Sequence, residues 1–187
     1  NYIEKLKKEK LLLEENISEK LKEKDIENVT YDSRKVKENT LFLCKGSKFK
    51  IEYLENSLNS GAIAYVSEKQ YKIEDKPYII VNNIRRAIAV LTSLYNNYPQ
   101  KEINMIGITG TKGKSTTSYY IKYILDDYMK DLGKNETAII SSIDTYDGKS
   151  RQEAVLTTPE PEELFMHIRN AVDSNMENLV MEVCSQA

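Results

Sequence analysis

The stretch INMIGITGTKGKSTT, from Ile103 to Thr117, decides the fold. The segment up to Ile108 is mostly apolar and predicts a short buried strand, and a helical pattern begins after Gly113. The loop between them carries two glycines. In such a loop, backbone N–H groups and the N-terminus of the following helix form a site for phosphate oxygens. The stretch therefore predicts a phosphate-binding turn between a strand and a helix.

The side chains around this turn are of the types that ATP chemistry uses. Lys114 would reach the outer phosphates, and the Ser115 hydroxyl would hold Mg²⁺. The strict pattern G-x-x-x-x-G-K-[ST] is not met, because Ile108 stands where its first glycine is expected. An ordinary glycine-rich turn is the alternative, but Gly-Lys-Ser between a strand and a helix favours a phosphate loop. The predicted ATP-binding residues are Gly110, Thr111, Lys112, Gly113, Lys114, Ser115 and Thr116, with Lys114 as the candidate catalytic residue.

Strands and helices alternate after this turn, an order typical of a parallel sheet covered by helices. We expect further strands at 137–142 and 178–183, and helices at 114–129 and 162–174. Glu182 stands at the end of the last strand, which in a parallel sheet lies beside the phosphate loop. It is a candidate magnesium ligand, and a solvated or helix-capping glutamate is the alternative.

The chain before residue 100 predicts a separate mixed α/β domain. Apolar residues at helical spacing over residues 2–24 indicate one amphipathic helix. We expect strands at 29–31, 40–43, 62–67 and 78–81, a helix that stops at Gly61 and a helix capped by Asn83. Pro99 marks the limit of that last helix. The predicted domains therefore cover residues 1–100 and 101–187.

Other features of the second domain have plain structural interpretations. Thr158 has the residue type of a helix N-cap, with Pro159 at the first helical position. An anionic substrate would also fit beside such a helix start. His167 is the only histidine and is expected to be structural. Four tyrosines after the phosphate loop are expected to pack rather than to stack on bases: Tyr119, Tyr120, Tyr123 and Tyr128.

Composition excludes several function classes. The 187 residues include 27 Lys and Arg against 29 Asp and Glu, and this net charge of -2 does not favour nucleic-acid binding. No apolar run approaches the roughly 18 residues of a membrane span, and the charged start lacks the apolar core of a signal peptide. We expect a cytoplasmic monomer in which Cys44 and Cys184 are reduced. The missing initiator Met and the ending at Ala187 suggest a piece of a longer protein.

The loop from Gly110 to Thr116 resembles the phosphate loop of the Mur ligases, Gly-Thr-Asn/Lys-Gly-Lys-Thr/Ser. Three further stretches resemble that family in order and spacing: Asp32-Ser33-Arg34, Thr157-Thr158-Pro159 and MEVCSQA from Met181 to Ala187. Together they resemble the MurE type, which adds the third peptide residue, over about residues 29–187. Two positions depart from the family pattern, because Cys184 replaces a serine and Gln186 replaces a histidine.

The resemblance implies a fold and a reaction. The fold is an N-terminal mixed α/β domain that binds a uridine nucleotide, followed by the first part of a P-loop central domain with a parallel sheet. The reaction is an ATP-dependent ligation in peptidoglycan precursor synthesis. ATP phosphorylates the glutamate side chain of UDP-N-acetylmuramoyl-L-alanyl-D-glutamate, and the amine of a diamino acid attacks the acyl phosphate. ATP and Mg²⁺ would be the cofactors.

The resemblance also implies which residues act. Ser115 and Glu182 would hold the metal, and the nucleotide-dipeptide would bind Ser33, Thr157, Thr158 and Cys184. The rest of the central sheet, a carbamylated lysine that holds a second metal and a C-terminal domain that selects the amino acid would lie outside this chain. The chain alone is therefore expected to be inactive, and the identity of the diamino acid stays open.

Three other interpretations remain. Folylpolyglutamate synthase shares the phosphate loop, but the long stretch before Ile103 counts against it. A ligase of the MurF type shares Asp-Ser-Arg, but is not expected to combine Thr-Thr-Pro with the later Glu-Val-x-Ser pattern. A nucleotide-binding module without ligase activity is the alternative from a different class, and Cys184 and Gln186 are its only support.

Overall fold

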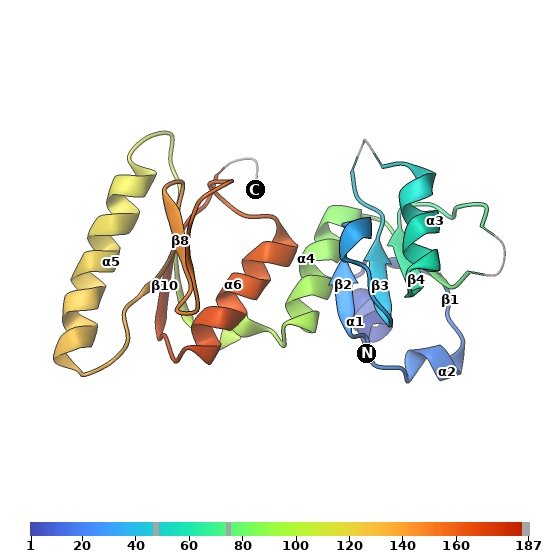
Figure 1. The fold of residues 1–187 in the computed structure, drawn as a ribbon, viewed down its shortest axis with the longest axis horizontal. Helices are drawn as coiled ribbons and strands as arrows, with labels where there is room; N and C mark the ends of the chain where they lie inside the picture. The colour runs from blue at the N-terminus through green and yellow to red at the C-terminus, as the bar shows by residue number, and fades with distance from the viewer. Residues whose placement is uncertain (47–48, 74–75, 185–187) are drawn as a thin grey trace. The chain divides into compact units, whose positions relative to one another are not determined.

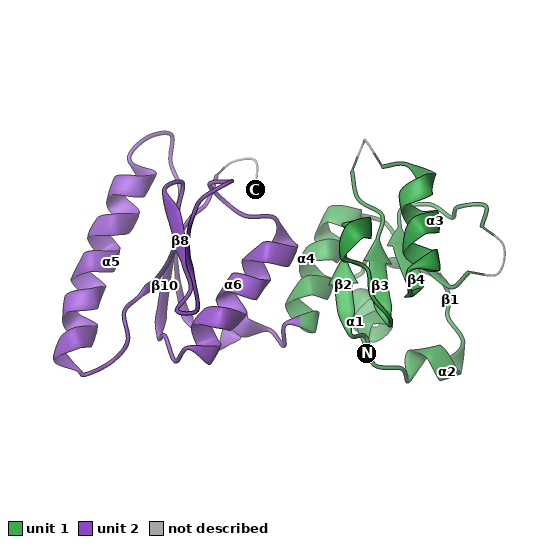
Figure 2. Ribbon diagram, viewed as in Figure 1, with its two compact units in different colours: residues 1–95 green, residues 96–187 purple. Residues whose placement is uncertain are grey.

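The chain forms two compact units, Asn1–Tyr95 and Asn96–Ala187 (Figure 2). The computed structural model describes residues 1–46, 49–73 and 76–184. Each unit has its own five-stranded sheet, and among the described residues two apolar clusters pack on the first sheet and one on the second. The division falls between Tyr95 and Asn96. No helix among the described residues is long and apolar enough to cross a membrane.

The first unit is a mixed sheet with helices on it (Figure 1). Its strands lie in the order β1-β5-β4-β3-β2, and only the β1–β5 pair is antiparallel. The strands are β1 (Leu12–Asn16), β2 (Asn28–Thr30), β3 (Thr40–Leu43), β4 (Ala62–Ser67) and β5 (Tyr78–Val81). The helices are α1 (Tyr2–Lys8), α2 (Glu19–Lys22), the 3₁₀ turn η1 (Ser33–Lys35), α3 (Ile51–Asn59) and α4 (Ile84–Tyr95).

Alternate residues of the central strands serve two different cores. Leu41 and Leu43 of β3 belong to the core that α1 and α4 cover, whereas Phe42 belongs to the core that α3 covers. This alternation follows from the period of two in a β-strand. Every residue of β3 is buried, so helices cover both faces of the sheet at this strand.

The prediction of one helix over residues 2–24 is wrong. The chain forms α1, then β1, then the short helix α2. Lys10 follows α1 with a left-handed φ of 56°, and β1 pairs with β5, with Leu12 opposite Val81. Helix propensity is worth less than about 1 kcal/mol per residue for ordinary residues, so pairing with a sheet edge outweighs it here.

Gly61 lies where α3 turns into β4, as its sequence position predicts. Its φ is +111°, and a Cβ built there would lie 2.9 Å from the backbone N and Cα of Glu38. The position therefore requires glycine both for its backbone conformation and for the close approach of another segment.

We expect Gly61→Ala to lower the free energy of unfolding of the first unit by about 2 to 4 kcal/mol, because positive φ and the backbone clash both add strain. Gly46→Ala is the matched control, since Gly46 has a φ of +97° with no atom within 4 Å of an added Cβ. That variant should lose about 1 to 2 kcal/mol. Urea unfolding of both variants measures the difference, and equal losses would contradict the role of the contact with Glu38.

The second unit combines a parallel sheet with an antiparallel hairpin. Its strand order is β6-β10-β7-β8-β9, in which β6, β10 and β7 are parallel. The strands are β6 (Asn104–Ile108), β7 (Ala138–Ile140), β8 (Asp144–Tyr146), β9 (Arg151–Glu153) and β10 (Asn178–Glu182). The helices are the 3₁₀ turn η2 (Pro99–Lys101), α5 (Lys114–Asp131) and α6 (Pro161–Asp173). The parallel strands and both long helices agree with the prediction, and the hairpin β8–β9 is an addition to it.

Helices α5 and α6 lie on opposite sides of this sheet (Figure 1). α6 contributes Ile168 and Ala171 to the apolar core. α5 buries Ser118, Lys122 and Met129 instead. The expectation that the tyrosines of α5 pack is wrong for Tyr120 and Tyr128, which are 67% and 58% exposed. Tyr123 is 60% exposed, but its ring centroid lies 5.8 Å from that of Tyr119. Tyr119 donates a hydrogen bond to Asp144 of β8.

His167 has the structural role that the sequence predicts. Its Nδ1 lies 2.7 Å from Oδ2 of Asp147, and both side chains are buried. Asp147 also accepts hydrogen bonds from Asn170 and from the backbone N–H groups of Lys149 and Ser150. The carboxylate therefore ties the turn between β8 and β9 to helix α6.

The pKa of Asp147 is below its ordinary value. Burial opposes ionisation, but hydrogen bonds from Asn170, His167 and the backbone N–H groups together outweigh it. The folded-state pKa is thus lower than the unfolded one of about 3.9, so the ionised Asp147 contributes stability above that pH. This contribution is lost as the pH falls through the folded-state pKa.

We expect Asp147→Asn to lower the free energy of unfolding at pH 7 by about 2 to 3 kcal/mol, because the change breaks a buried hydrogen-bonded network. The loss should shrink as the pH falls below about 4, because the unfolded wild-type chain then takes up a proton at Asp147, and it should be smallest below the lower folded-state pKa, where the native carboxylate is protonated too. Asp131→Asn, at an exposed carboxylate, is the control. Urea unfolding over a pH series measures both, and a loss that stays constant down to the lowest pH would contradict the assignment.

Candidate nucleotide-binding site

The predicted phosphate loop connects β6 to α5 without interruption. Gly113 is the N-cap of α5 with a φ of 78°, and Gly110 has a φ of 146°. Lys114 begins the helix, and its Nζ donates a hydrogen bond to the carbonyl oxygen of Gly110 at 2.9 Å. Residues 109–113 are exposed. The N-terminus of α5 and a lysine ammonium group therefore lie at one exposed turn, an arrangement that attracts phosphate.

Strand register brings Glu182 to this turn. In the parallel pair of β10 and β6, Glu182 lies opposite Ile108, the last residue before the loop. On the other side of β10, Met181 lies opposite Ile140, so the residues after β7 reach the same edge. The carboxyl ends of three neighbouring strands thus meet here, as they do at ligand sites of open parallel sheets.

A chain of three side chains connects these strand ends. The Oε1 atom of Glu182 accepts hydrogen bonds from the backbone N–H of Ser142 at 2.9 Å and from its hydroxyl at 3.2 Å. The Ser142 hydroxyl also lies 2.8 Å from the hydroxyl of Ser115 on α5. Glu182 is 1% exposed, so this carboxylate is a buried hydrogen-bonded group rather than a solvated one.

The sequence did not single out Ser142. It follows an apolar strand just as Glu182 ends one, and a search for polar residues at the ends of all the parallel strands would have found it. The separation of 40 residues between Ser142 and Glu182 hides the contact in the linear chain.

The donor atoms of Ser115 and Glu182 fit a Mg²⁺ ion that takes only part of its ligands from the protein. Mg²⁺ prefers oxygen ligands, and a hydroxyl and a carboxylate supply them. The described residues contain no group of three or more His, Cys, Asp and Glu side chains that could hold a metal ion. A Mg²⁺ ion here would thus take its other ligands from phosphates and water, which is how Mg²⁺ usually binds with nucleotides.

Thr158 lies beside the same strand end. Its hydroxyl donates to the carbonyl oxygen of Glu182 at 2.9 Å and accepts from the backbone N–H of Cys184 at 3.1 Å. The N-cap prediction for Thr158 is wrong, because α6 begins later, with Glu160 as N-cap and Pro161 at the first turn. The hydroxyl is used to hold the chain after β10 rather than to cap the helix.

Thr157 and Cys184 are half-buried next to this contact in sequence. Gln186 and the neighbouring Ser185 lie outside the described residues. Cys44 and Cys184 are both free thiols, as the sequence predicts.

We expect Thr158→Val to release the segment that follows β10, because the Cys184 N–H loses its acceptor. A hydrogen bond of about 1 kcal/mol corresponds to roughly fivefold faster exchange of that amide. Hydrogen exchange followed by NMR measures the effect, with Thr157→Val as the neighbouring control. Equal exchange of the Cys184 amide in wild type and Thr158→Val would contradict this role.

The Asp32-Ser33-Arg34 segment lies at the carboxyl end of β2 in the first unit. Asp32 accepts hydrogen bonds from the backbone N–H, Nε and Nη2 of Arg34, at 3.0, 2.9 and 2.7 Å. Hydrogen bonding by the Arg34 side chain outweighs burial and lowers the pKa of Asp32 to about 2. Asp32 and Arg34 thus shape the turn, and Ser33 is its first residue, half-buried.

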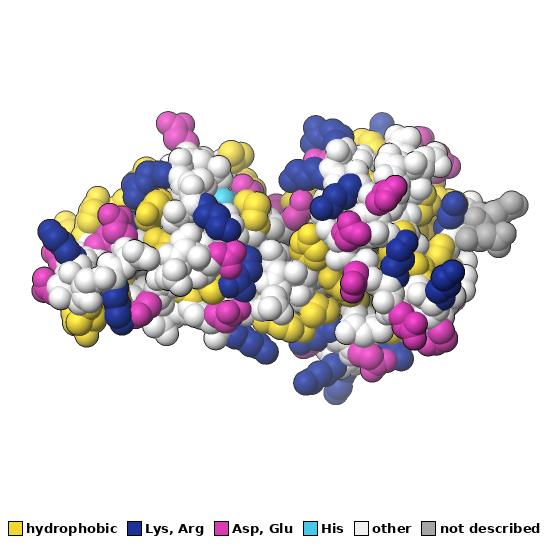
Figure 3. Space-filling view, turned by 60° about the horizontal axis from the view of Figure 1, so that its bottom comes forward, with side chains coloured by type: hydrophobic (Ala, Val, Ile, Leu, Met, Phe, Trp, Pro, Cys, Tyr) yellow, Lys and Arg dark blue, Asp and Glu magenta, His cyan; other side chains and the backbone are white. Residues whose placement is uncertain are grey.

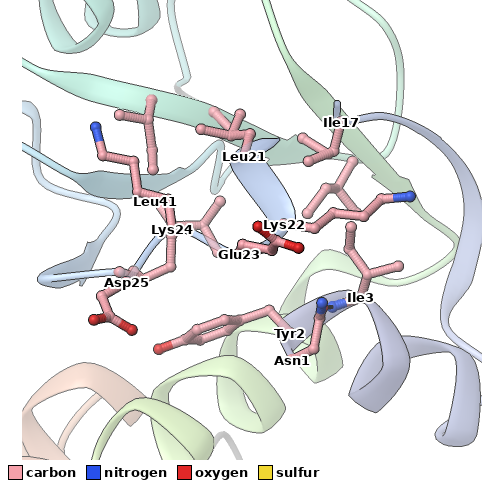
Figure 4. Close-up of a pocket in the computed structure, with 14 residues that line it drawn as sticks. Asn1, Tyr2, Ile3, Ile17, Leu21, Lys22, Glu23, Lys24, Asp25 and Leu41 are labelled. Atoms are coloured by element: carbon pink, nitrogen blue, oxygen red, sulfur yellow. Dashed lines mark hydrogen bonds between the residues drawn. The ribbon is translucent and has the colours of Figure 1, made fainter. Parts of the chain in front are cut away.

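Two of the hollows in the first unit differ in size and lining. A cavity of about 620 Å³ lies beyond the carboxyl ends of β3 and β4, and its lining includes Lys45, Lys69 and Arg85. Ser33 is not among the described residues that line this cavity. A smaller, largely apolar hollow of about 270 Å³ has Leu21 and Leu41 on one side and Tyr2 on the other (Figure 4). None of the described residues that the sequence predicts to bind ATP, metal or substrate lines this smaller hollow.

Charge does not mark a further binding surface on the face shown in Figure 3. Basic and acidic side chains are interspersed there over both units. The site is therefore best defined by the phosphate loop and the strand ends of the second unit.

Comparison with known proteins finds similar sequences for most of the chain. Residues 108–187 match the model of the Mur ligase middle domain. The chain is 42% identical over 172 residues to the UDP-N-acetylmuramoyl-L-alanyl-D-glutamate--L-lysine ligase of Enterococcus faecalis, covering 91% of this chain and 33% of that protein. Residues 108–187 are thus similar to the middle domain of the Mur ligases, and most of the chain is similar to a named ligase of that family. The resemblance found in the sequence is thereby confirmed.

A second relative is similar to most of the chain. The UDP-N-acetylmuramyl-tripeptide synthetase of Ligilactobacillus salivarius is 48% identical over 165 residues, covering 86% of this chain and 31% of that protein. The chain thus spans about one third of the length of the curated relatives it matches.

Solved structures confirm the predicted α/β fold. A UDP-N-acetylmuramoyl-L-alanyl-D-glutamate--2,6-diaminopimelate ligase superimposes with a TM-score of 0.71 at 18% identity, over 91% of this chain and 34% of that one. The MurF ligase from Thermotoga maritima in complex with ADP gives a TM-score of 0.54 at 22% identity, over 87% of this chain and 33% of that one. At these identities the likeness concerns the fold alone.

Proposed function

We propose that this chain belongs to an ATP-dependent enzyme that adds a diamino acid to UDP-N-acetylmuramoyl-L-alanyl-D-glutamate in peptidoglycan precursor synthesis. The observation that carries the proposal is the meeting of the phosphate loop, Ser115 and Glu182 at one sheet edge. The names of the Enterococcus and Ligilactobacillus relatives support the substrate. The parallel module of residues 101–187 would bind ATP, and residues 1–100 would bind the uridine nucleotide.

The residues of the loop have roles that follow from their chemistry. Lys114 and the N-terminus of α5 would bind the outer phosphates and neutralise charge on the transferring phosphoryl group. Ser115 and Glu182 would hold Mg²⁺, which would supply further positive charge to the phosphates. Gly110, Thr111, Lys112, Gly113 and Thr116 would surround the phosphate oxygens with backbone and side-chain donors.

The chemistry has two balanced steps. An oxygen of the substrate carboxylate forms a bond to the γ-phosphorus while the bond to ADP breaks, which yields an acyl phosphate. The amine of the diamino acid then attacks the acyl carbon, inorganic phosphate leaves, and the nitrogen loses a proton. Positioning of the reactants supplies much of the rate, because the phosphoryl group needs no covalent help from the protein.

Four residues, described for each unit by itself, are the ones that we propose for binding the nucleotide-dipeptide. Thr157, Thr158 and Cys184 border Glu182 in the second unit, and Ser33 lies at a strand end of the first. The partners would be small molecules, and the enzyme would act as a cytoplasmic monomer. The amino acid remains open between lysine and diaminopimelate, because the Enterococcus relative is named for the first and a structural neighbour for the second.

The test is phosphate release from ATP by the complete protein, given the nucleotide-dipeptide and, in separate reactions, lysine or diaminopimelate. Release that needs both the nucleotide-dipeptide and one amino acid is the expected result, and it names the amino acid. ATP binding without release in any mixture would overturn the proposal and favour a nucleotide-binding module without ligase activity.

We expect Lys114→Ala to lower kcat/KM of the complete enzyme for ATP by about 10²- to 10³-fold, because a charge on the transferring phosphoryl group loses its partner. Lys130→Ala removes an exposed lysine near the other end of α5 and should leave the rate unchanged. Steady-state phosphate release measures both. Equal rates in the two variants would show that the loop does not act on ATP.

A further inference from the structure

Ser142 occupies the centre of the candidate site, although no motif includes it. It follows β7, the strand on the far side of β10 from the phosphate loop. Its hydroxyl oxygen lies 2.8 Å from Oγ of Ser115 and 3.2 Å from Oε1 of Glu182. One oxygen atom thus contacts both of the side chains that we propose as magnesium ligands.

The directions of these hydrogen bonds follow from the chemistry of the groups. An ionised carboxylate only accepts, so the hydroxyl of Ser142 donates its single proton to Glu182. The hydroxyl of Ser115 must then be the donor to Ser142. This order leaves the lone pairs of the Ser115 oxygen available to a cation.

Ser142 also determines how the Glu182 carboxylate is held. Glu182 is 1% exposed, and a buried carboxylate needs hydrogen bonds to offset its lost hydration. The backbone N–H of Ser142 donates to the same oxygen, Oε1, as the hydroxyl does. Two donors from one residue therefore fix the orientation of the carboxylate.

We infer that Ser142 is a positioning residue for the Mg²⁺ ion that accompanies ATP. It holds the Glu182 carboxylate and the Ser115 hydroxyl on either side of one hydroxyl group before the ion binds. The inference rests on the proposed function, because it concerns the metal of the proposed ATP site. Residues that orient metal ligands commonly change metal affinity by 10- to 100-fold when they are replaced.

The test measures how ATP binding by the complete protein depends on Mg²⁺ at equilibrium, without turnover. Ser142→Ala keeps the backbone N–H but loses the hydroxyl, so we expect about tenfold more Mg²⁺ for half-maximal ATP binding. In the presence of EDTA, which removes Mg²⁺, Ser142→Ala and the wild type should bind ATP equally. Ser142→Thr retains a hydroxyl and should keep the wild-type dependence on Mg²⁺.

Ser141→Ala is the matched control. The Ser141 hydroxyl donates to the carbonyl oxygen of Asp144 at 2.9 Å and accepts from the N–H groups of Ile143 and Asp144. Its loss should weaken the turn after β7, which a lower melting temperature reports, without changing the Mg²⁺ dependence. A general structural effect would instead change the Mg²⁺ dependence of both serine variants, and that result would overturn the inference.

The outcomes separate the inference from the proposed function. Unchanged Mg²⁺ dependence in folded Ser142→Ala, with ATP binding still weakened by Lys114→Ala, would overturn the role of Ser142 alone. Wild-type ATP binding that neither needs Mg²⁺ nor responds to Lys114→Ala would overturn the proposed function as well. The inference is supported if Ser142→Ala needs about tenfold more Mg²⁺ for half-maximal ATP binding while Ser141→Ala and Ser142→Thr need as much as the wild type.

Discussion

The parallel pairing of β10 with β6 and β7 is the constraint on which the site depends. This register places Glu182 opposite Ile108, where the phosphate loop begins, and places the residues after Ile140 at the same edge. Parallel strands end on the same side of a sheet, so loops far apart in sequence meet there. A shift of one residue in β10 would turn Glu182 to the other face of the sheet and away from Ser142.

Polar side chains also hold loops at both edges of the sheet in the second unit. The Thr158 hydroxyl bonds to the backbone on both sides of Val183, and Asp147 ties the β8–β9 turn to α6 through His167 and Asn170. Buried polar groups stabilise a structure only when they are satisfied, and then they favour one arrangement over others. Thr158 thus holds the loop between β9 and α6 against the chain after β10, and Asp147 holds the turn between β8 and β9 against α6.

Local patterns predicted most elements of the second unit, and their failures have identifiable causes. The hairpin of β8 and β9 escaped prediction because its three-residue strands, Asp-Thr-Tyr and Arg-Gln-Glu, lack an apolar alternation. Thr158 had the residue type of an N-cap but is used by the backbone after β10. The helix over residues 2–24 failed because β5 offered an edge for β1 to pair with. In each case a tertiary partner outweighed a local preference of about 1 kcal/mol or less.

The sequence by itself determined the phosphate loop, its strand and its helix, because glycines, a lysine and a serine at these positions act through local backbone geometry. It also determined the family, since four short motifs occur in the family's order. Only the tertiary structure decided which polar groups surround the loop. Ser142 and Glu182 are 40 residues apart, and their contact depends on strand order and register. Such long-range pairing leaves no local signal, because it depends on which strands become neighbours rather than on the residues beside each position.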